Sequence, residues 1–582
     1  MCSKLKILCL WSVILCTMAC MAGTLESKVV TVTPAPPQSM ASTPTSHLPA
    51  GQTPLPTPPG GAPPSSLYPI GNPVLTELYV SPNGSDGNSG LAQDAPLQTI
   101  GAAWAKIPEG GALSSTGFRI NLLPGVYPCE PAEPDNCQNA YHNRRGTAQY
   151  PIILQALHGP GTVEVRGGFD ISHVAYLYLI DLSLAGGGEL PTNQSGNNLL
   201  HLTESEHILL RGVRLIGPDC ANDTCNNLQE VLKVNQVQYL YVEESEIGGA
   251  WHSSVDFFNV QTGHFIHNNV HTAGQWCMYV KGGTSYLRVE GNEFHHCQLG
   301  FQAGQSSNLA MIRSPWYQYE AYDIKFVNNL LHDLPGVALS VSGGYNILFA
   351  YNTVYRAAGD TASGYALVQT VLGERGCNAT DELPNPLPIC RSSLAAGAWG
   401  PQILSDNQPG IPNRNVYVYN NLIYNPAGVQ SLYAQFYFQG GMARPAGFQN
   451  LPETITSDDN LRIAGNVIWN GPADHPLGID AGSGCQDSNP TCNAAQLIAE
   501  NAINKFEPQL ANPAGGNYRP AAGSNLYAQA ATPIPDFVWN DAPPGVPVGT
   551  LSNAVGTDRD GNLRSSSSPV GAYSVSGIPP EP

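Results

Sequence analysis

Lys281 is the residue whose type and setting point most directly to chemistry. It ends an alternating apolar segment and precedes Gly282 and Gly283. A lysine at the end of a strand can act as a general base when burial or nearby cations lower its pKa from about 10.4. Removal of the proton α to a uronate carboxylate, with loss of the 4-linked sugar, needs such a base and a positive partner. Arg288 follows closely and is the second candidate. The alternative for Lys281 is a solvated lysine before a Gly-Gly turn.

Histidines form a second group with chemical potential. His271 and His295 fall at nearly equivalent places in neighbouring copies of a repeated phrase, so they can stack or form a general acid/base pair. Clustered histidines can equally fill turn and strand-end positions of a repeat. No spacing among them selects three metal ligands.

Paired carboxylates are the third possibility. An inverting glycosidase needs two carboxyl groups about 6.5–9.5 Å apart. Glu230 and Asp256 are the only candidate pair that the repeat brings near Lys281. They define a weaker, hydrolytic alternative.

A recurring phrase indicates how these residues are positioned. An apolar residue, any residue, Gly or Asn, Asn, any residue and an apolar residue follow one another in Val289–Phe294, and similar phrases begin at Ile266, Val327, Ala350, Val418 and Ile463. The shortest spacing is about 23 residues. Alternation recurs three times in each period, as in Cys277–Val280, Tyr286–Val289 and Glu293–His295. This predicts a solenoid with three short parallel strands per coil, in which stacked asparagines hydrogen-bond along the axis.

The solenoid predicts a groove beside Lys281. Met278 and Val280 should point into the core, and Cys277, Tyr279 and Lys281 should point outward. Alignment on the repeated asparagine extends this outward column to Lys233, Asp256, Gln302 and Gln369. Insertions at about 305–320 and 371–414 leave the coil just after this strand and can wall the groove. The first insertion carries side chains suited to contact with sugar rings, namely Arg313, Trp316, Tyr317 and Tyr319.

The whole repeat region, about 77–575, resembles the right-handed parallel β-helix family, which is the architecture of pectate lyases. The segments Tyr79–Gly87, Ala95–Ile100, Asp558–Gly561 and Gly571–Tyr573 are similar to the beginning and end of such chains. The resemblance implies an all-β solenoid whose open N-terminal end is covered by a short helix within Thr99–Lys106.

Val280–Gly283, with Arg288 and Asn292–Phe294 after it, resembles the alginate lyase and chondroitinase B family. In that family a lysine ends the strand and an Asn-Thr-Phe turn follows. The resemblance implies β-elimination with Lys281 in the catalytic role. Family members have acidic calcium ligands just upstream, where this chain has Gly274 and Trp276. We therefore predict no cofactor, and Ca²⁺ stays an open alternative.

The N-terminal 75 residues indicate export. Residues 1–20 combine Lys4 and Lys6 with a mostly apolar stretch that ends at Ala19-Cys20, and they resemble a lipoprotein signal in which Cys20 is lipidated. Plain secretion is the alternative. Residues 21–75 are rich in Pro, Thr and Ser and predict a disordered tether. The β-helix is then expected at 76–520 and a closing segment at 521–582.

Cysteine spacing agrees with an oxidising compartment. Beyond the signal, the ten cysteines fall into close pairs. Four pairs are predicted disulfides, with zinc as the rival interpretation: Cys129/Cys137, Cys220/Cys225, Cys377/Cys390 and Cys485/Cys492. For Cys277 and Cys297 the sequence leaves bonding open.

The composition limits the classes of partner that the chain can be expected to bind. The formal net charge of −19 argues against nucleic acid, whose phosphates need a basic face. With 61 Gly and 50 Pro in 582 residues, the chain is turn-rich rather than helical. The predicted partner is a polysaccharide or cell-surface glycan, and membrane contact is expected only through a lipid anchor. Two functions remain: a polysaccharide lyase acting on uronic-acid-containing glycan, or a non-catalytic glycan-binding, adhesin or structural β-helix.

Overall fold

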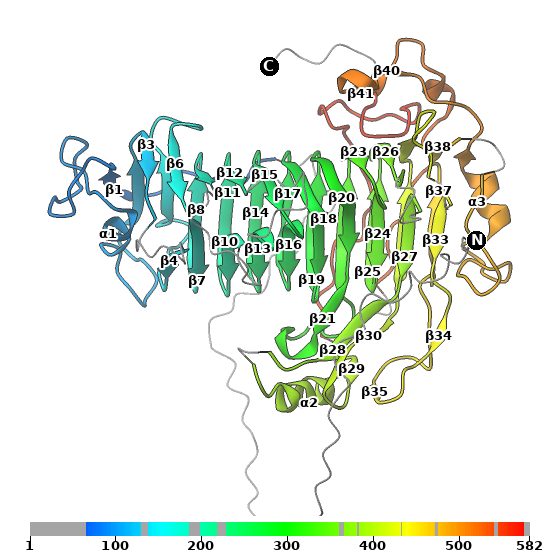
Figure 1. The fold of residues 1–582 in the computed structure, drawn as a ribbon, viewed down its shortest axis with the longest axis horizontal. Coiled ribbons are helices and arrows are strands. Elements are labelled where there is room, and N and C mark those ends of the chain that lie inside the picture. The colour runs from blue at the N-terminus through cyan, green and yellow to red at the C-terminus, as the bar shows by residue number, and fades with distance from the viewer. Residues whose placement is uncertain are drawn as a thin grey trace, which may run out of the picture. The chain divides into compact units, whose positions relative to one another are not determined.

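The structure is a computed structural model, and it describes residues 66–129, 138–185, 198–217, 228–359, 366–380, 383–431, 434–471, 475–539 and 545–575. These residues belong to one of the chain's two compact units, Pro58–Pro582. Coils of short parallel strands stack along one axis from β1 to β38 (Figure 1). The predicted right-handed parallel β-helix is confirmed. Among the described residues, no helix has the length and apolarity needed to cross a membrane.

Each coil contributes one strand to each of three ladders, which we call faces 1, 2 and 3 in chain order. Face 1 consists of β1 (Leu75–Val80), β2 (Gly117–Leu122), β5 (Ile152–Ala156), β8 (Ala175–Ile180), β11 (Glu206–Arg211), β14 (Gln238–Glu243), β17 (Gln261–Ile266), β19 (Thr284–Glu290), β22 (Ala321–Val327), β25 (Gly344–Ala350), β31 (Arg414–Tyr419) and β37 (Arg462–Ala464).

Face 2 follows the asparagine turn. It consists of β3 (Gly125–Tyr127), β6 (Val163–Arg166), β9 (Ser183–Ala185), β12 (Arg214–Ile216), β15 (Glu246–Ala250), the first parts of β18 (Asn269–Lys281) and β20 (Glu293–Ala303), β23 (Leu330–Leu334), β26 (Thr353–Ala357), β32 (Leu422–Tyr424), β38 (Val467–Trp469) and β39 (Ala502–Ile503).

Face 3 closes the coil. It consists of β4 (Gln138–His142), β7 (Gly168–Ser172), β10 (Asn198–Thr203), β13 (Glu230–Asn235), β16 (Ser253–Phe258), the last parts of β18 and β20, β24 (Leu339–Ser342), β27 (Val368–Val371) and β33 (Phe436–Phe438). β18 and β20 therefore each bend from face 2 onto face 3 without leaving the sheet.

The two long insertions form a protrusion at the edge between faces 3 and 1, where α2, β28 and β30 extend from the stack (Figure 1). The two insertions supply β21 (Ser306–Asn308), η1 (Leu309–Met311), β28 (Gly373–Cys377), α2 (Leu387–Ala395), β29 (Gly400–Pro401) and β30 (Ser405–Ile411). The segment between β33 and β37 adds β34 (Met442–Ala443), β35 (Phe448–Gln449) and β36 (Thr454–Ile455) to the protrusion, where β35 pairs with β29. The C-terminal region adds α3 (Ala494–Glu500), β40 (Leu510–Asn512), η2 (Pro513–Gly515), β41 (Asn517–Pro520) and η3 (Asn525–Ala528).

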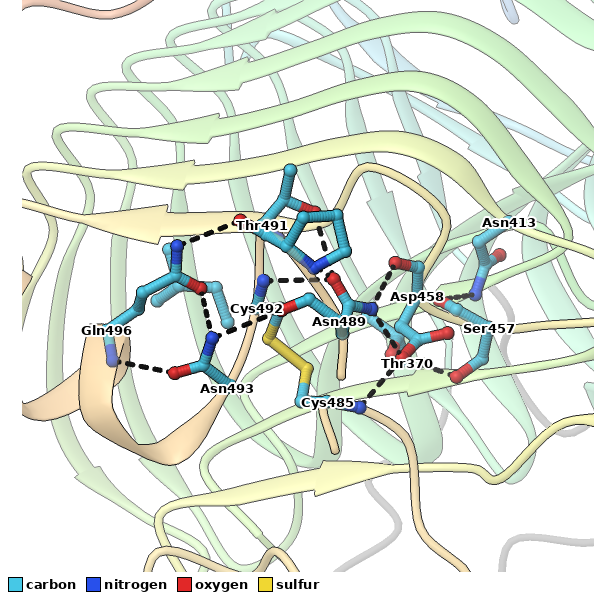
Figure 2. The surroundings of a disulfide bond; sticks show 12 residues. Thr370, Asn413, Ser457, Asp458, Cys485, Asn489, Thr491, Cys492, Asn493 and Gln496 are labelled. Carbon is cyan, nitrogen blue, oxygen red and sulfur yellow. Dashed lines mark hydrogen bonds between the residues drawn. A yellow bond between two sulfur atoms is a disulfide. The ribbon is translucent and has the colours of Figure 1, made fainter. Parts of the chain in front are cut away.

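Both ends of the core are covered. At the N-terminal end, α1 (Ile100–Trp104) begins after Thr99, whose side chain accepts a hydrogen bond from the Ala102 amide, and it buries Trp104 against Tyr141. This confirms the predicted capping helix. At the other end, the loop closed by Cys485–Cys492 lies against the last coils, held by Asn489 and Asp458 (Figure 2). Within the predicted closing segment, 521–582, the described residue Thr557 lies beside face 1, where its carbonyl accepts a hydrogen bond from the Asn328 side chain.

An asparagine ladder fixes the register between coils. Its rungs are Asn268, Asn292, Asn329, Asn352, Asn421, Asn466 and Asn501, all buried. The Oδ1 atom of Asn292 accepts from the backbone amide and the side-chain amide of Asn268 at 2.8 and 3.0 Å. Its Nδ2 atom donates to the Phe265 carbonyl at 2.9 Å. Within Ile266–His271 the stacked residue is the first asparagine, Asn268.

Replacing Asn292 by alanine should lower the free energy of unfolding of these coils by roughly 3 kcal/mol, because the buried Asn268 amide and the Phe265 carbonyl lose their partners. Hydrogen exchange of the coil amides measures this. The half-buried side chain of Asn269 hydrogen-bonds the His295 ring rather than a rung of the ladder, so Asn269→Ala is the matched control. Equal effects of the two substitutions would contradict the ladder's role.

Disulfides in the described residues join Cys277–Cys297, Cys377–Cys390 and Cys485–Cys492. Cys129 is also disulfide-bonded, whereas Cys137, Cys220 and Cys225 lie outside the described residues. The outward orientation predicted for Cys277 is wrong: Cys277 and its neighbour Met278 both lie in the core, so the alternation breaks where β18 bends from face 2 onto face 3. Disulfides are typical of exported proteins.

Candidate functional site

Two of the three faces are covered by other parts of the chain. On face 1, Tyr68 packs on Tyr178 and Tyr241, so residues that the composition assigns to the tether lie against the body. Farther along face 1, Trp316 and Tyr319 form a buried cluster with strand tyrosines and Trp539. On face 2, C-terminal aromatic residues such as Tyr518 pack over His332 and Tyr355. Face 3, by contrast, borders a cavity.

Face 3 carries the column that alignment on the asparagines predicts. Strand register places Lys233, Asp256, Tyr279, Gln302 and Gln369 in line, with Ser340 between the two glutamines. Ser340 donates to the Gln302 side chain at 2.8 Å and accepts from Gln369 at 2.9 Å. The column therefore changes from charged side chains at Lys233 to a hydrogen-bonded row of amides and a hydroxyl.

The charged end of the column forms what we call the Lys281 cluster: Glu230, Lys233, His252, Asp256, Tyr279 and Lys281. Asp256 is fully buried and accepts hydrogen bonds from the Lys233 ammonium and, at 2.7 Å, from the Tyr279 hydroxyl. Glu230 Oε1 lies 3.9 Å from Lys233 Nζ and 3.7 Å from His252 Nδ1.

Burial and neighbouring charges shift the pKa values of the groups in the Lys281 cluster in different directions. Burial raises the pKa of Glu230 to about 7. For Asp256, burial acts in the same direction, but the charges of Lys233 and Lys281 hold its pKa below the usual range. Burial and the same two lysines lower the pKa of His252 to about 4, so its imidazole is neutral at pH 7. Because Asp256 and Glu230 are buried, they are not positioned as a hydrolytic pair around a glycosidic bond.

Lys281 sits where β18 turns towards face 1. Gly282 and Gly283 adopt φ values of +64° and +83°, and a side chain on Gly282 would meet the Phe258 ring. The Lys281 ammonium donates to Gln305 Oε1 at 3.0 Å and lies 4.8 Å from the Tyr279 ring centroid. Burial lowers the pKa of Lys281, and the positive charge of Lys233 adds to this, while Asp256 opposes it. The amine is therefore easier to deprotonate than an exposed lysine.

A cavity of about 370 Å³ adjoins Lys281 through Gln305. Its lining is mostly polar: Gln302, Gln305, Ser306, Ser342, Val371, Leu372, Glu374, Pro409 and Gln439. This volume lies within the usual range for ligand sites, about 300–1,000 Å³. Sequence reasoning identified Gln302 but missed Gln305, Glu374 and Gln439. The only available signal was that the long insertions follow this strand.

The side chains of the first insertion that were predicted to contact sugar rings lie elsewhere in the structure. Trp316 and Tyr319 are only 7 % and 5 % exposed, because their rings fill the face 1 cluster. Tyr317 packs near the Cys377–Cys390 disulfide, and Arg313 forms an ion pair with Glu204 at 2.8 Å. The structure does not bring these four side chains to the cavity.

Three other predicted catalytic residues lie on other faces. Arg288 is on face 1, because the Gly-Gly turn separates β19 from β18, and it pairs with Glu290 at 2.6 Å. His271 and His295 stack on face 2 with ring centroids 5.1 Å apart. The Lys281 cluster is on face 3, so the stacked histidines lie on a different face from it.

The histidine stack continues to His332, 4.9 Å from His295. His332 contacts Asp333 and Glu293 through its two ring nitrogens at 2.8 and 3.0 Å, and these bonds raise its pKa although burial opposes them. Burial and the neighbouring His332 lower the pKa of His295 to about 4. The two stacked imidazoles therefore differ in pKa, with His332 the more basic of the pair.

The residues present do not fit the calcium site that the resemblance implies. The two buried carboxylates nearest Lys281 are compensated by Lys233, whose ammonium lies where a cation would be needed. No cluster of metal-binding side chains occurs among the described residues.

No protein-family model matches the sequence, and no curated protein matches it significantly. Solved structures with a similar fold include pectate lyase Pel9A, at 13 % identity and a TM-score of 0.39, covering 83 % of this chain and 97 % of that one. A rhamnogalacturonan lyase matches at 11 % identity and a TM-score of 0.40, covering 72 % and 94 %. XylC in complex with xylose matches at 9 % identity and a TM-score of 0.41, covering 86 % and 98 %.

Proposed function

We propose that this chain is an exported carbohydrate-active protein that cleaves a uronic-acid-containing glycan by β-elimination, with Lys281 as the base. The observation that carries the proposal is the position of the Lys281 amine: half-buried, with a lowered pKa, and bonded to Gln305 at the wall of a polar cavity. Solved lyases among the similar structures are consistent with it.

The proposed reaction begins with a uronate bound at the cavity. The neutral Lys281 amine takes the proton at C5, α to the carboxyl group. The electron pair of that C–H bond forms the C4=C5 double bond, and the C4–O4 bond breaks with its pair going to the leaving sugar. Amide and hydroxyl groups such as Gln302 and Ser342 are suited to hold the sugar hydroxyls.

The overall charge of −19 does not prevent binding of an acidic glycan, because the charge at the Lys281 cluster, where the glycan would bind, differs from that of the whole chain. Near neutral pH Glu230 is partly protonated, since its pKa is about 7, and Asp256 is already paired with Lys233. The Lys281 cluster therefore becomes more positive as the pH falls through 7. Uronate affinity should be stronger at pH 6 than at pH 8.

The test is incubation of the exported chain with a panel of polyuronates while the ultraviolet absorbance of the unsaturated product is followed. A rise for at least one polymer is expected, with or without a calcium chelator. No rise on any polymer would overturn the elimination proposal.

Non-catalytic glycan binding is the second candidate, favoured by the hydrogen-bonded row Gln302–Ser340–Gln369. Ser340 is fully buried within this row, so the amide of the half-buried Gln369 is the group that the row offers to a neutral chain. Calorimetry with the same panel separates the two functions, because a binder gives heat without unsaturated product.

We also propose that Cys20 is lipidated and holds the body at a membrane. Residues 1–65, which include Cys20, lie outside the described residues. Cys20→Ser should move the protein from the membrane fraction to the soluble fraction, because the acyl chains supply the membrane affinity. Cys16→Ser is the matched control, and identical partitioning of the two variants would contradict the proposal.

A further inference from the structure

Glu374 is the only ionisable side chain in the lining of the cavity. It lies on β28, where Ser306 of β21 is its strand partner, and its amide donates to the Gln305 carbonyl at 2.9 Å. The Gln305 side chain in turn accepts the hydrogen bond from Lys281. The carboxyl group of Glu374 thus lines the cavity, and the amine of Lys281 is linked to the same lining through Gln305.

The surroundings of Glu374 favour its protonated form. Its side chain is half-buried, and none of the described side chains pairs with it. Burial raises the pKa of Glu374, and the Glu320 carboxylate adds to this. The adjacent Arg375 offers no compensation, because it is fully buried on the other side of β28 with Glu320 and the Tyr317 and Trp399 carbonyls.

Other nearby acids are not available to a ligand in the cavity. The Tyr279 hydroxyl is committed to Asp256 in a side chain that is 1 % exposed. Glu230 is buried beneath Lys233, and His252 is neutral at working pH. Elimination nevertheless leaves an oxyanion on the departing sugar, so a proton donor near the cavity is needed.

We propose that Glu374 is the catalytic acid that protonates the leaving O4 atom when Lys281 removes the C5 proton. This inference rests on the function proposed above. The protons and electron pairs of this step balance. Lys281 gains the proton from C5, and the C5–H electron pair forms the C4=C5 bond. The C4–O4 electron pair passes to O4, which takes the proton of Glu374. Proton exchange with water then restores the neutral amine and the protonated carboxyl group.

The test compares two substrates in the full chain. On the polymer, Glu374→Gln should lower kcat by about 10²–10⁴-fold, the usual contribution of a general acid. On a uronate with an aryloxide leaving group at C4, the same variant should keep kcat within about threefold of the wild type, because an aryloxide needs little protonation. Lys281→Ala should lose activity on both substrates.

The pH profile gives a second readout. Wild-type elimination needs a neutral amine and a protonated carboxyl group together, so its profile should be bell-shaped. Glu374→Gln removes the carboxyl requirement and should leave a rate that only rises with pH to a plateau. Glu453→Gln, an exposed glutamate of the same protrusion, is the matched control and should behave as wild type.

The outcomes separate this inference from the proposed function. Absence of unsaturated product with the wild-type chain defeats the function itself. An active wild type with equal losses on both substrates in Glu374→Gln overturns the role of Glu374 as acid, and so does an unchanged kcat on the polymer. Selective loss on the polymer, with the altered pH profile, supports it.

Discussion

Lys281→Ala should lower kcat for elimination by about 10²–10⁴-fold, the range that a positioned general base contributes. The reason is that the buried carboxylates Asp256 and Glu230 and the weakly basic His252, whose pKa is about 4, cannot take its place. The assay is product absorbance with the polymer that the wild type cleaves. KM should change less than kcat, because Gln302, Gln305 and Gln439 still line the cavity.

Lys281→Arg separates basicity from charge. A guanidinium keeps the positive charge but stays protonated at any working pH, so it cannot remove a proton. We expect Lys281→Arg to be as inactive as Lys281→Ala while binding uronate more tightly. Lys106→Ala, at an exposed lysine after α1, is the control and should leave the rate unchanged. Appreciable activity in Lys281→Arg would assign Lys281 an electrostatic role instead.

The pH dependence follows from the direction of the Lys281 shift. Burial places its pKa below 10.5, so the neutral, active amine accumulates at lower pH than it does for an exposed lysine. In Glu374→Gln, whose rate no longer depends on the carboxyl group, the rate should therefore rise with pH and level off above the Lys281 pKa, which lies below 10.5. Removing the nearby positive charge with Lys233→Met should move this rise to higher pH, because Lys233 helps to hold the Lys281 pKa down.

The second large effect concerns the buried ion pair that joins the two insertions. Glu320→Gln should destabilise the protrusion by about 3–5 kcal/mol, because it leaves the Arg375 guanidinium buried with a partner that carries no charge. Both side chains are fully buried, and Arg375 Nε lies 2.7 Å from Glu320 Oε1. Glu320 also accepts from the Gly282 amide at 3.1 Å, so the substitution should loosen the turn that follows Lys281.

Hydrogen exchange in β21 and β28 measures this change locally, which matters because a solenoid does not unfold as one unit. The double variant Glu320→Gln/Arg375→Met should recover most of the protection, since it removes the uncompensated charge. Arg356→Met, which breaks the exposed pair with Asp333, should cost less than about 1 kcal/mol. If hydrogen exchange in the double variant is as fast as in Glu320→Gln, then packing around residue 320, and not charge, stabilises the protrusion.

The fold was predictable because its signal is local and repeated. Each copy of the phrase carries its own turn asparagine and alternating strands, and stacking of identical turns brings like positions into register. The same register predicts the column from Lys233 to Gln369, although that column lies far from the asparagines themselves. Thr99 likewise marks the start of the capping helix through a hydrogen bond within its own turn.

The cavity was not predictable, because its walls come from insertions whose packing depends on distant partners. Trp316 and Tyr319 pack on face 1 in a cluster with Trp539, which lies more than 200 residues later in the sequence. Glu374 reaches the cavity only because β28 pairs with β21 and Arg375 binds Glu320, 55 residues apart. The bend in β18 also places Cys277 in the core beside Met278, which strict alternation along a strand does not predict.

The sequence by itself thus determined the coil, its register and the place of Lys281 on an outward strand end, because these follow from short-range patterns repeated in every turn. Only the tertiary structure decided that Arg288, His271 and His295 lie on other faces, and that Gln305 links Lys281 to the cavity that Glu374 lines. The physical reason is that a solenoid transmits order from one coil to the next, whereas an insertion folds against whatever distant surface completes its burial.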